Sequence, residues 1–175
     1  MENEGINFPY LQSLMTDPLL VNWQKKSGDR KKLYTRVLNR VHKTKTLQLL
    51  PALHDEAFSK IDCLSCAACC KNYSPRFTGP DIRRASKAIG IKEGAFKEKY
   101  LTVDADGDFV VTTAPCPFLG DDNFCSIYEH RPTDCRRFPY TDEDVLLKRP
   151  LITEKNATFC PAVYFVLEKL VAINL

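Results

Sequence analysis

The sequence predicts a mainly α-helical fold with a small β-hairpin, organised as a single cysteine-rich domain. Three observations lead to this fold class. Apolar residues recur at helical spacing through most of the chain, one short β-branched run follows an Asp-Gly turn, and the 175 residues include eight cysteines. A hydrophobic content of 44% with ten Phe and seven Tyr predicts a real apolar core at this length.

Residues 1–60 are predicted to form a helical and partly basic N-terminal segment. The apolar stretch of residues 8–24 is broken at Asp17-Pro18, which predicts two short helices. Ser27-Gly28-Asp29 is expected to break the chain again and to cap the next helix. A further amphipathic piece, residues 47–61, leads to the first cysteine.

Residues 78–100 are predicted to form two short helices. Thr78 or Gly79 caps the first of them, with Pro80 in its first turn, and Gly90 ends it. The second helix is expected over residues 92–100, because apolar residues recur there at helical spacing.

The acidic stretch Asp104–Asp108 invites comparison with a calcium-binding loop, but its spacing is wrong for one. An EF-hand loop needs Gly at position six and Glu at position twelve, whereas here Gly107 is fourth and Pro115 is twelfth. Asp106-Gly107 followed by Phe109-Val-Val-Thr-Thr instead predicts a hairpin turn and a strand.

Four of the eight cysteines lie within the eight residues Cys63-Leu-Ser-Cys66-Ala-Ala-Cys69-Cys70. Sulfurs at this spacing can converge on one soft metal centre, as in cysteine-rich zinc sites and iron-sulfur clusters. Free cysteines are too sparse in ordinary cores to cluster in this way, and adjacent Cys69 and Cys70 are poorly placed to bridge each other. The motif therefore predicts a metal site, so that residues 61–175 form a metal-stapled chelating domain.

The other four cysteines, Cys116, Cys125, Cys135 and Cys160, stand in local contexts that orient them. Cys160 precedes Pro161 at the start of an apolar helix, where the helix dipole favours a thiolate. Cys116 ends the predicted strand, and a turn at residues 120–123 returns the chain to Cys125. We predict that all eight sulfurs converge in space and serve as metal or cluster ligands.

Six segments share the order and spacing of a known family. They are Cys63-Leu-Ser-Cys66-Ala-Ala-Cys69-Cys70, Cys116-Pro117-Phe118-Leu119, Cys125-Ser126-Ile127-Tyr128, Arg131-Pro132, Cys135-Arg136-Arg137-Phe138-Pro139 and Cys160-Pro161-Ala162-Val163. Together, over at least Ile61 to Leu170, they resemble the YkgJ-type CxxCxxCC proteins, which are described as zinc- or iron-chelating. The resemblance implies that all eight cysteines belong to the family pattern, and it supplies no defined reaction.

The sequence offers few histidines that could serve as metal ligands. Tyr140 stands where many relatives are expected to carry His, and His42 and His54 lie on predicted helices as surface or packing residues. His130, between Cys125 and Cys135, is the remaining possible ligand. Eight sulfurs can already complete two four-coordinate sites without it.

The charge is unevenly distributed although the net charge is only +3. Lys25 to Lys45 includes nine Lys or Arg and the single acidic residue Asp29. This stretch could contact nucleic acid or an acidic partner, but the solvated face of an amphipathic helix is the simpler interpretation.

A cytoplasmic location is expected. The N-terminus Met-Glu-Asn-Glu-Gly lacks a signal-peptide pattern, and no apolar run approaches the roughly 20 residues of a membrane span. In a reducing cytoplasm, eight cysteines are expected to bind metal rather than to form disulfides.

Three functions compete. The first is an iron-sulfur protein in which Cys63, Cys66 and Cys69 resemble half of a ferredoxin loop and Cys116 or Cys160 supplies a remote fourth ligand. The second is a structural zinc protein with two four-cysteine sites that serves protein or nucleic-acid binding. The third is a protein-modifying enzyme, because a similar cysteine-rich region occurs in flagellin lysine N-methylases; it rests on analogy alone.

Overall fold

The computed structural model describes residues 17–174, and the expected helix before Asp17-Pro18 lies outside them. The fold class is confirmed: the described chain is mainly helical with one small antiparallel sheet. Its contacts divide it into two compact units. Unit 1 contains residues up to Cys66 and those from Thr141 onward, and unit 2 contains Ala67–Tyr140. The predicted boundary after residue 60 stays a prediction.

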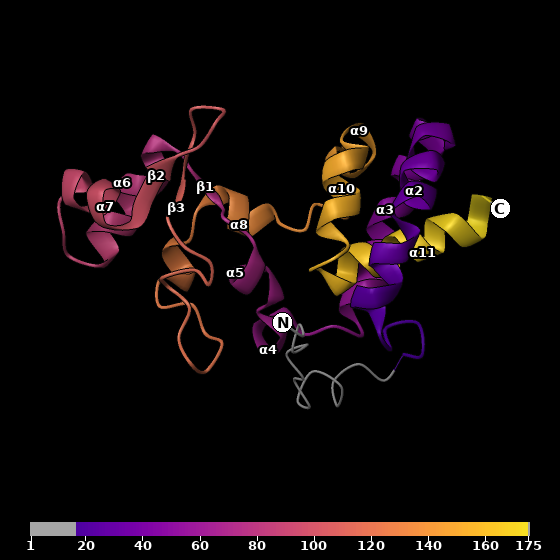
Figure 1. Ribbon diagram of the computed structural model, residues 1–175, viewed down its shortest axis with the longest axis horizontal. Helices are drawn as coiled ribbons and strands as arrows, with labels where there is room; N and C mark the ends of the chain where they lie inside the picture. The colour runs from indigo at the N-terminus through magenta and orange to yellow at the C-terminus, as the bar shows by residue number, and fades with distance from the viewer. Residues whose placement is uncertain (1–16, 175) are drawn as a thin grey trace, which may run out of the picture. The chain divides into compact units, whose positions relative to one another are not determined.

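Unit 1 is built from helices. They are α2 (Trp23–Arg40), α3 (Lys43–Phe58), α4 (Cys63–Cys66), α9 (Val145–Lys148), α10 (Pro150–Asn156) and α11 (Pro161–Asn174). Helix α2 packs against α10 and α11, and α11 also packs against α3 (Figure 1). Large side chains such as Tyr34, Leu38, Leu50 and Phe165 are completely buried between these helices.

The predicted helix break at Ser27-Gly28-Asp29 is wrong, because α2 continues through it. Trp23 before this point and Tyr34 after it are both buried in unit 1. The Ser27 hydroxyl is buried as well and donates to the carbonyl oxygen of Gln24 at 2.9 Å. Burial of one continuous apolar face therefore outweighs the loss of about 1 kcal/mol that Gly brings to a helix interior.

Unit 2 is built from shorter elements around a three-stranded sheet. They are α5 (Ala68–Asn72), β1 (Arg76–Phe77), α6 (Gly79–Ala88), α7 (Glu93–Tyr100), β2 (Leu101–Val103), β3 (Phe109–Val111), η1 (Tyr128–His130) and α8 (Thr133–Arg137). The strand order is β1-β3-β2 with antiparallel pairing (Figure 1). Phe109 pairs with Phe77 on one side and with Val103 on the other.

The predicted hairpin turn is present between β2 and β3. Gly107 has a φ of 82°, and the backbone N–H groups of Asp106 and Asp108 both donate to Asp104 Oδ1. The strand Phe109–Val111 pairs with residues before the turn. The sequence also predicts a small hairpin near Phe109 to Ile127, and the pairing within that range is limited to the isolated bridge between Leu119 and Cys125.

A small aromatic core supports the sheet of unit 2. Phe96 stacks on Phe118 with ring centroids 5.8 Å apart, and Phe77 lies 5.8 Å from Phe96. Cys116 and Cys125 pack against this same core. The apolar cluster of unit 2 therefore places two of the predicted ligands.

The described helices include none that is both long enough and apolar enough to cross a membrane.

Candidate metal centre

The eight predicted ligands are divided between the two units. Unit 1 contains Cys63, Cys66 and Cys160, and unit 2 contains Cys69, Cys70, Cys116, Cys125 and Cys135. The boundary between the units falls between Cys66 and Ala67, inside the four-cysteine motif. The predicted convergence of all eight sulfurs stays a prediction, and the geometry is described here within each unit.

Cys69 and Cys70 both lie on the short helix α5, with their Sγ atoms 3.9 Å apart. The residue before this helix, Ala67, has a left-handed φ of 46°. The backbone N–H of Cys116 donates to the carbonyl oxygen of Cys70 at 2.7 Å. This hydrogen bond connects the segment that follows the sheet to the four-cysteine motif.

The turn at residues 120–123 brings Cys116 and Cys125 together, as the sequence predicted. The N–H of Gly120 donates to the carbonyl oxygen of Phe124 at 2.8 Å, and Leu119 bridges to Cys125. Both thiols accept a hydrogen bond from the backbone two residues later, Cys116 from Phe118 and Cys125 from Ile127. Such bonds favour the thiolate, the form that binds metal.

Cys135 on α8 completes a group of four thiols in unit 2, which we call the four-thiol cluster: Cys70, Cys116, Cys125 and Cys135. In all six pairs among them, the charge of one sulfur acts on another. The four side chains come from four separate segments of the chain. Tertiary structure, rather than the local motif, therefore gathers them.

Burial sets the electrostatics of this cluster. It raises the pKa of the Cys116 thiol to about 11 and also raises the pKa of Cys125 and Cys135. A hydrogen bond with Cys69 lowers the pKa of Cys70 to about 7, against its burial. Raised pKa values keep Cys116, Cys125 and Cys135 protonated at neutral pH, and a bound metal cation is the group that would favour their thiolates.

Two carboxylates hold the segments around the four-thiol cluster, and the sequence reasoning missed these long-range roles. Asp134, the neighbour of Cys135, accepts from the Tyr73 hydroxyl at 2.6 Å, from the Arg76 backbone N–H at 2.9 Å and from the Tyr140 hydroxyl. Tyr73 follows Cys70 by three residues. Asp134 therefore ties α8 to the segment after the motif.

Asp81 is the second of these carboxylates and is 1% exposed. It caps α6 by accepting from Thr78, and it accepts from both the backbone N–H and the hydroxyl of Thr133 at 3.0 Å. Burial would raise the pKa of Asp81, but the Thr78 and Arg84 hydrogen bonds lower it to about 2. The Thr-x-x-Asp spacing is the sequence signal for its capping role.

The three thiols of unit 1 also lie within electrostatic range of one another. Cys160 is buried directly before Pro161, the first residue of α11, as predicted, and it accepts hydrogen bonds from Ala162 and Val163. Burial raises the pKa of Cys160, and the charges of Cys63 and Cys66 raise it further.

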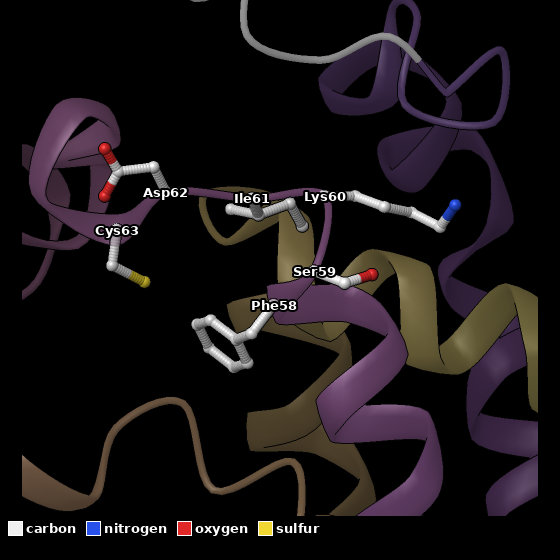
Figure 2. Close-up of a pocket in the computed structure, with 6 residues that line it drawn as sticks. All are labelled: Phe58, Ser59, Lys60, Ile61, Asp62 and Cys63. Carbon is white, nitrogen blue, oxygen red and sulfur yellow. The ribbon is translucent and has the colours of Figure 1, made fainter.

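Cys63 lines an open hollow of about 430 Å³ on unit 1, formed by residues 58–63. Figure 2 shows the Phe58 ring and the Cys63 sulfur on one side of this loop, with the Asp62 carboxylate directed to the other side. Asp62 is engaged locally, because it accepts from the Leu64 backbone N–H at 3.0 Å and from the Ser65 hydroxyl. Cys63 is the exposed member of the unit 1 thiols.

The histidines have the following places. The His54 ring packs against Phe58 in a tilted arrangement with ring centroids 4.5 Å apart, and His54 Nδ1 lies 2.8 Å from the Thr141 hydroxyl, in agreement with the predicted packing role. His42 caps α3 by accepting from the Lys45 N–H at 3.4 Å. His130 is exposed at the end of η1.

No three His, Cys, Asp or Glu side chains among residues 17–174 are placed so that they could hold a metal ion as they stand. The donor set nevertheless suits a soft metal, since the four-thiol cluster consists of sulfur alone. Metal binding at this place requires the four sulfurs to move into ligating positions that they do not occupy in this structure.

A family model named CxxCxxCC, "Putative zinc- or iron-chelating domain", matches residues 62–161. The chain belongs to this CxxCxxCC family. The match begins just before Cys63 and ends just after Cys160, so the CxxCxxCC domain includes all eight cysteines. No curated protein and no solved structure matches the chain.

Proposed function

We propose that this CxxCxxCC protein holds an iron-sulfur cluster on the four-thiol cluster of unit 2. The single observation that carries the proposal is that tertiary contacts gather the four segments of Cys70, Cys116, Cys125 and Cys135. The Cys116 N–H donates to the Cys70 carbonyl oxygen at 2.7 Å, Leu119 pairs with Cys125, and Asp134 beside Cys135 accepts from the Tyr73 hydroxyl at 2.6 Å. When bound, such a cluster supplies one-electron transfer. The chain supplies four thiolates and backbone hydrogen bonds to two of the sulfurs.

The choice of a cluster over a single zinc ion rests on the spacing of these four cysteines along the chain. No two of them form a C-x2-C pair, whereas mononuclear zinc more often takes two separated C-x2-C pairs. Cys63-x2-Cys66-x2-Cys69, which has the spacing of half a ferredoxin loop, lies outside this set of four. Cys63, Cys66, Cys69 and Cys160 stay predicted metal ligands that this proposal does not assign to a site, and the protein works in a reducing compartment such as the cytoplasm.

Structural zinc is the second candidate, and the same sulfur group favours it. Four thiolates complete a tetrahedral zinc site, and eight cysteines divide into two such sites. Zinc at the four-thiol cluster would join α5, α8 and the turn at residues 120–123 and would serve as a structural staple. The two candidates differ in colour, because zinc is a d¹⁰ ion and a cluster absorbs visible light.

Purification without oxygen, followed by metal and acid-labile sulfide analysis, separates these candidates. We expect visible absorption and iron with matching sulfide, both strongly reduced in Cys116→Ser and unchanged in the surface variant Ser74→Ala. Colourless protein with stoichiometric zinc and no sulfide would replace the cluster by structural zinc. Protein that binds neither metal, or a Cys116→Ser variant with unchanged metal content, would refute the proposed site.

A further inference from the structure

Helix α2 carries a line of positive charge that the metal site does not use. The cations of α2 and of the start of α3 that are exposed are Lys25, Lys26, Lys31, Lys32, Arg36, Arg40, Lys43 and Lys45. Within residues 17–174, none of these side chains makes an ion pair. Arg30 differs from them, since it pairs with Glu168 at 2.8 Å.

The helical repeat sorts four of these cations onto one face. At 3.6 residues per turn, Lys25, Lys32, Arg36 and Arg40 fall within an arc of about 80°. The buried residues Trp23, Tyr34 and Leu38 lie on the opposite side of α2, in the core of unit 1. The four cations, which we call the basic stripe, therefore point away from that core.

The last three of the four cations in the stripe are evenly spaced. Lys32, Arg36 and Arg40 follow one another every four residues, which at 1.5 Å per residue separates them by about 6 Å along the helix axis. The exposed Asp29, the single acidic residue of α2, falls on the same face between Lys25 and Lys32, so the uninterrupted part of the stripe is Lys32, Arg36 and Arg40. A line of evenly spaced cations matches a polyanion whose charges are also evenly spaced, and a nucleic acid backbone is such a polyanion.

A membrane is a poorer match to α2. Helices that lie on membranes insert an apolar face below the headgroups. The apolar face of α2 is already buried, with Tyr34 and Leu38 at 0% exposure. Only the charged side of the helix is available to a partner.

We propose that the basic stripe of α2 binds the phosphate backbone of a nucleic acid duplex without reading its sequence. Lys and Arg contacts to phosphates supply most non-specific affinity and make it strongly salt-dependent. This inference goes beyond metal chelation and does not depend on which metal the protein holds.

The test uses the full chain as purified and a fluorescent DNA duplex of about 20 base pairs, longer than the roughly 27 Å of α2. Fluorescence anisotropy would be measured at several salt concentrations with two unrelated duplex sequences. Lys32→Gln/Arg36→Gln/Arg40→Gln removes the centre of the stripe. Lys87→Gln/Lys92→Gln/Lys155→Gln is the matched control, because it removes three exposed cations elsewhere.

We expect both sequences to bind equally. The stripe variant should lose affinity about 10²-fold near 0.1 M salt, with a salt slope flatter by about three, while the control changes little. Circular dichroism of the stripe variant should match the parent, since all three side chains are exposed. Absence of binding, equal losses in the two triple variants, or tighter binding to anionic phospholipid vesicles or polyglutamate than to the duplex would overturn the proposal.

Discussion

The two units of the chain are held together by different kinds of side chain. In unit 1, nine of the 14 residues of α11 are buried, and their side chains form a dense apolar core. In unit 2, the helices that carry Cys69, Cys70 and Cys135 contain no buried residue, and a core of eight apolar side chains lies beside them. Around these helices, thiols and the hydrogen-bonded carboxylates of Asp81 and Asp134 make the contacts that apolar side chains make in unit 1.

This difference has a consequence for stability. Buried apolar area stabilises unit 1 whether or not a metal is bound. Unit 2 depends on whether its thiols are held together, because without a cation Cys116 and Cys135 stay protonated and no metal bonds join their segments. We therefore expect loss of metal to damage unit 2 first, in line with the expectation that metal adds to a real core in this chain.

Removing one ligand of the four-thiol cluster should have the largest effect. Cys135→Ser should lose most of the metal bound in unit 2, and unit 2 should unfold, because structural thiolate sites contribute on the order of 10 kcal/mol. Metal per chain and thermal unfolding measure the two effects. Unchanged metal content in Cys135→Ser would remove this residue from the site.

Replacing one buried aromatic residue in each unit should show that the two units unfold separately. Phe165→Ala in unit 1 and Phe96→Ala in unit 2 each delete a side chain at 0% exposure, at a cost of about 3–5 kcal/mol. Trp23, the single Trp of the chain, lies in unit 1 at 6.3 Å from Tyr164 and reports on that unit by fluorescence. Phe165→Ala should shift the Trp23 transition in urea strongly.

Phe96→Ala should instead lower metal retention and leave the Trp23 transition close to that of the parent. A Trp23 transition that moves equally in both variants would show that the units unfold as one, and the comparison between them would lose its meaning.

The buried Asp81 should contribute a smaller amount, confined to unit 2. Its pKa of about 2 lies below the ordinary value of 3.8, so its stabilisation is fully present above about pH 4 and is lost as the pH falls toward 2. Asp81→Asn should destabilise unit 2 by about 2 kcal/mol at neutral pH. Urea unfolding of unit 2 at several pH values checks this, and an unchanged pH dependence in Asp81→Asn would contradict it.

The smallest expected effect concerns α2, in which the sequence wrongly predicts a helix break at Ser27-Gly28-Asp29. Gly28 is exposed within α2, and a Cβ added there meets no atom within 4 Å. Gly28→Ala should therefore stabilise unit 1 by about 0.5–1 kcal/mol, because Ala is a better helix former. A decrease in the stability reported by Trp23 fluorescence would indicate that Gly28 has another role.

Features that depend on neighbouring residues were predictable from the sequence. Thr78 and Pro80 mark the start of α6, Pro161 marks the start of α11, and Asp106-Gly107 marks the hairpin turn. Caps and turns are specified by side chains within a few residues, so the local sequence contains their physical cause.

Features that depend on distant residues were not predictable in the same way. The continuity of α2 through Gly28 depends on packing against α10 and α11, more than 100 residues later. The bond from Thr133 to Asp81 and the bond from Tyr73 to Asp134 join segments 52 and 61 residues apart. The cysteine pattern predicted a metal site, but not the allocation of its sulfurs to two units, because spacing carries no information on tertiary contacts.

Hydrogen exchange of the metal-loaded and the metal-stripped protein tests the central claim most directly. The claim is that the four-thiol cluster organises unit 2 around a metal, while an apolar core holds unit 1. We predict that stripping the metal removes amide protection across residues 67–140, most strongly in α5 and α8, and leaves α2 and α3 protected. Unchanged protection in unit 2, or an equal loss in α2 and α3, would contradict the account.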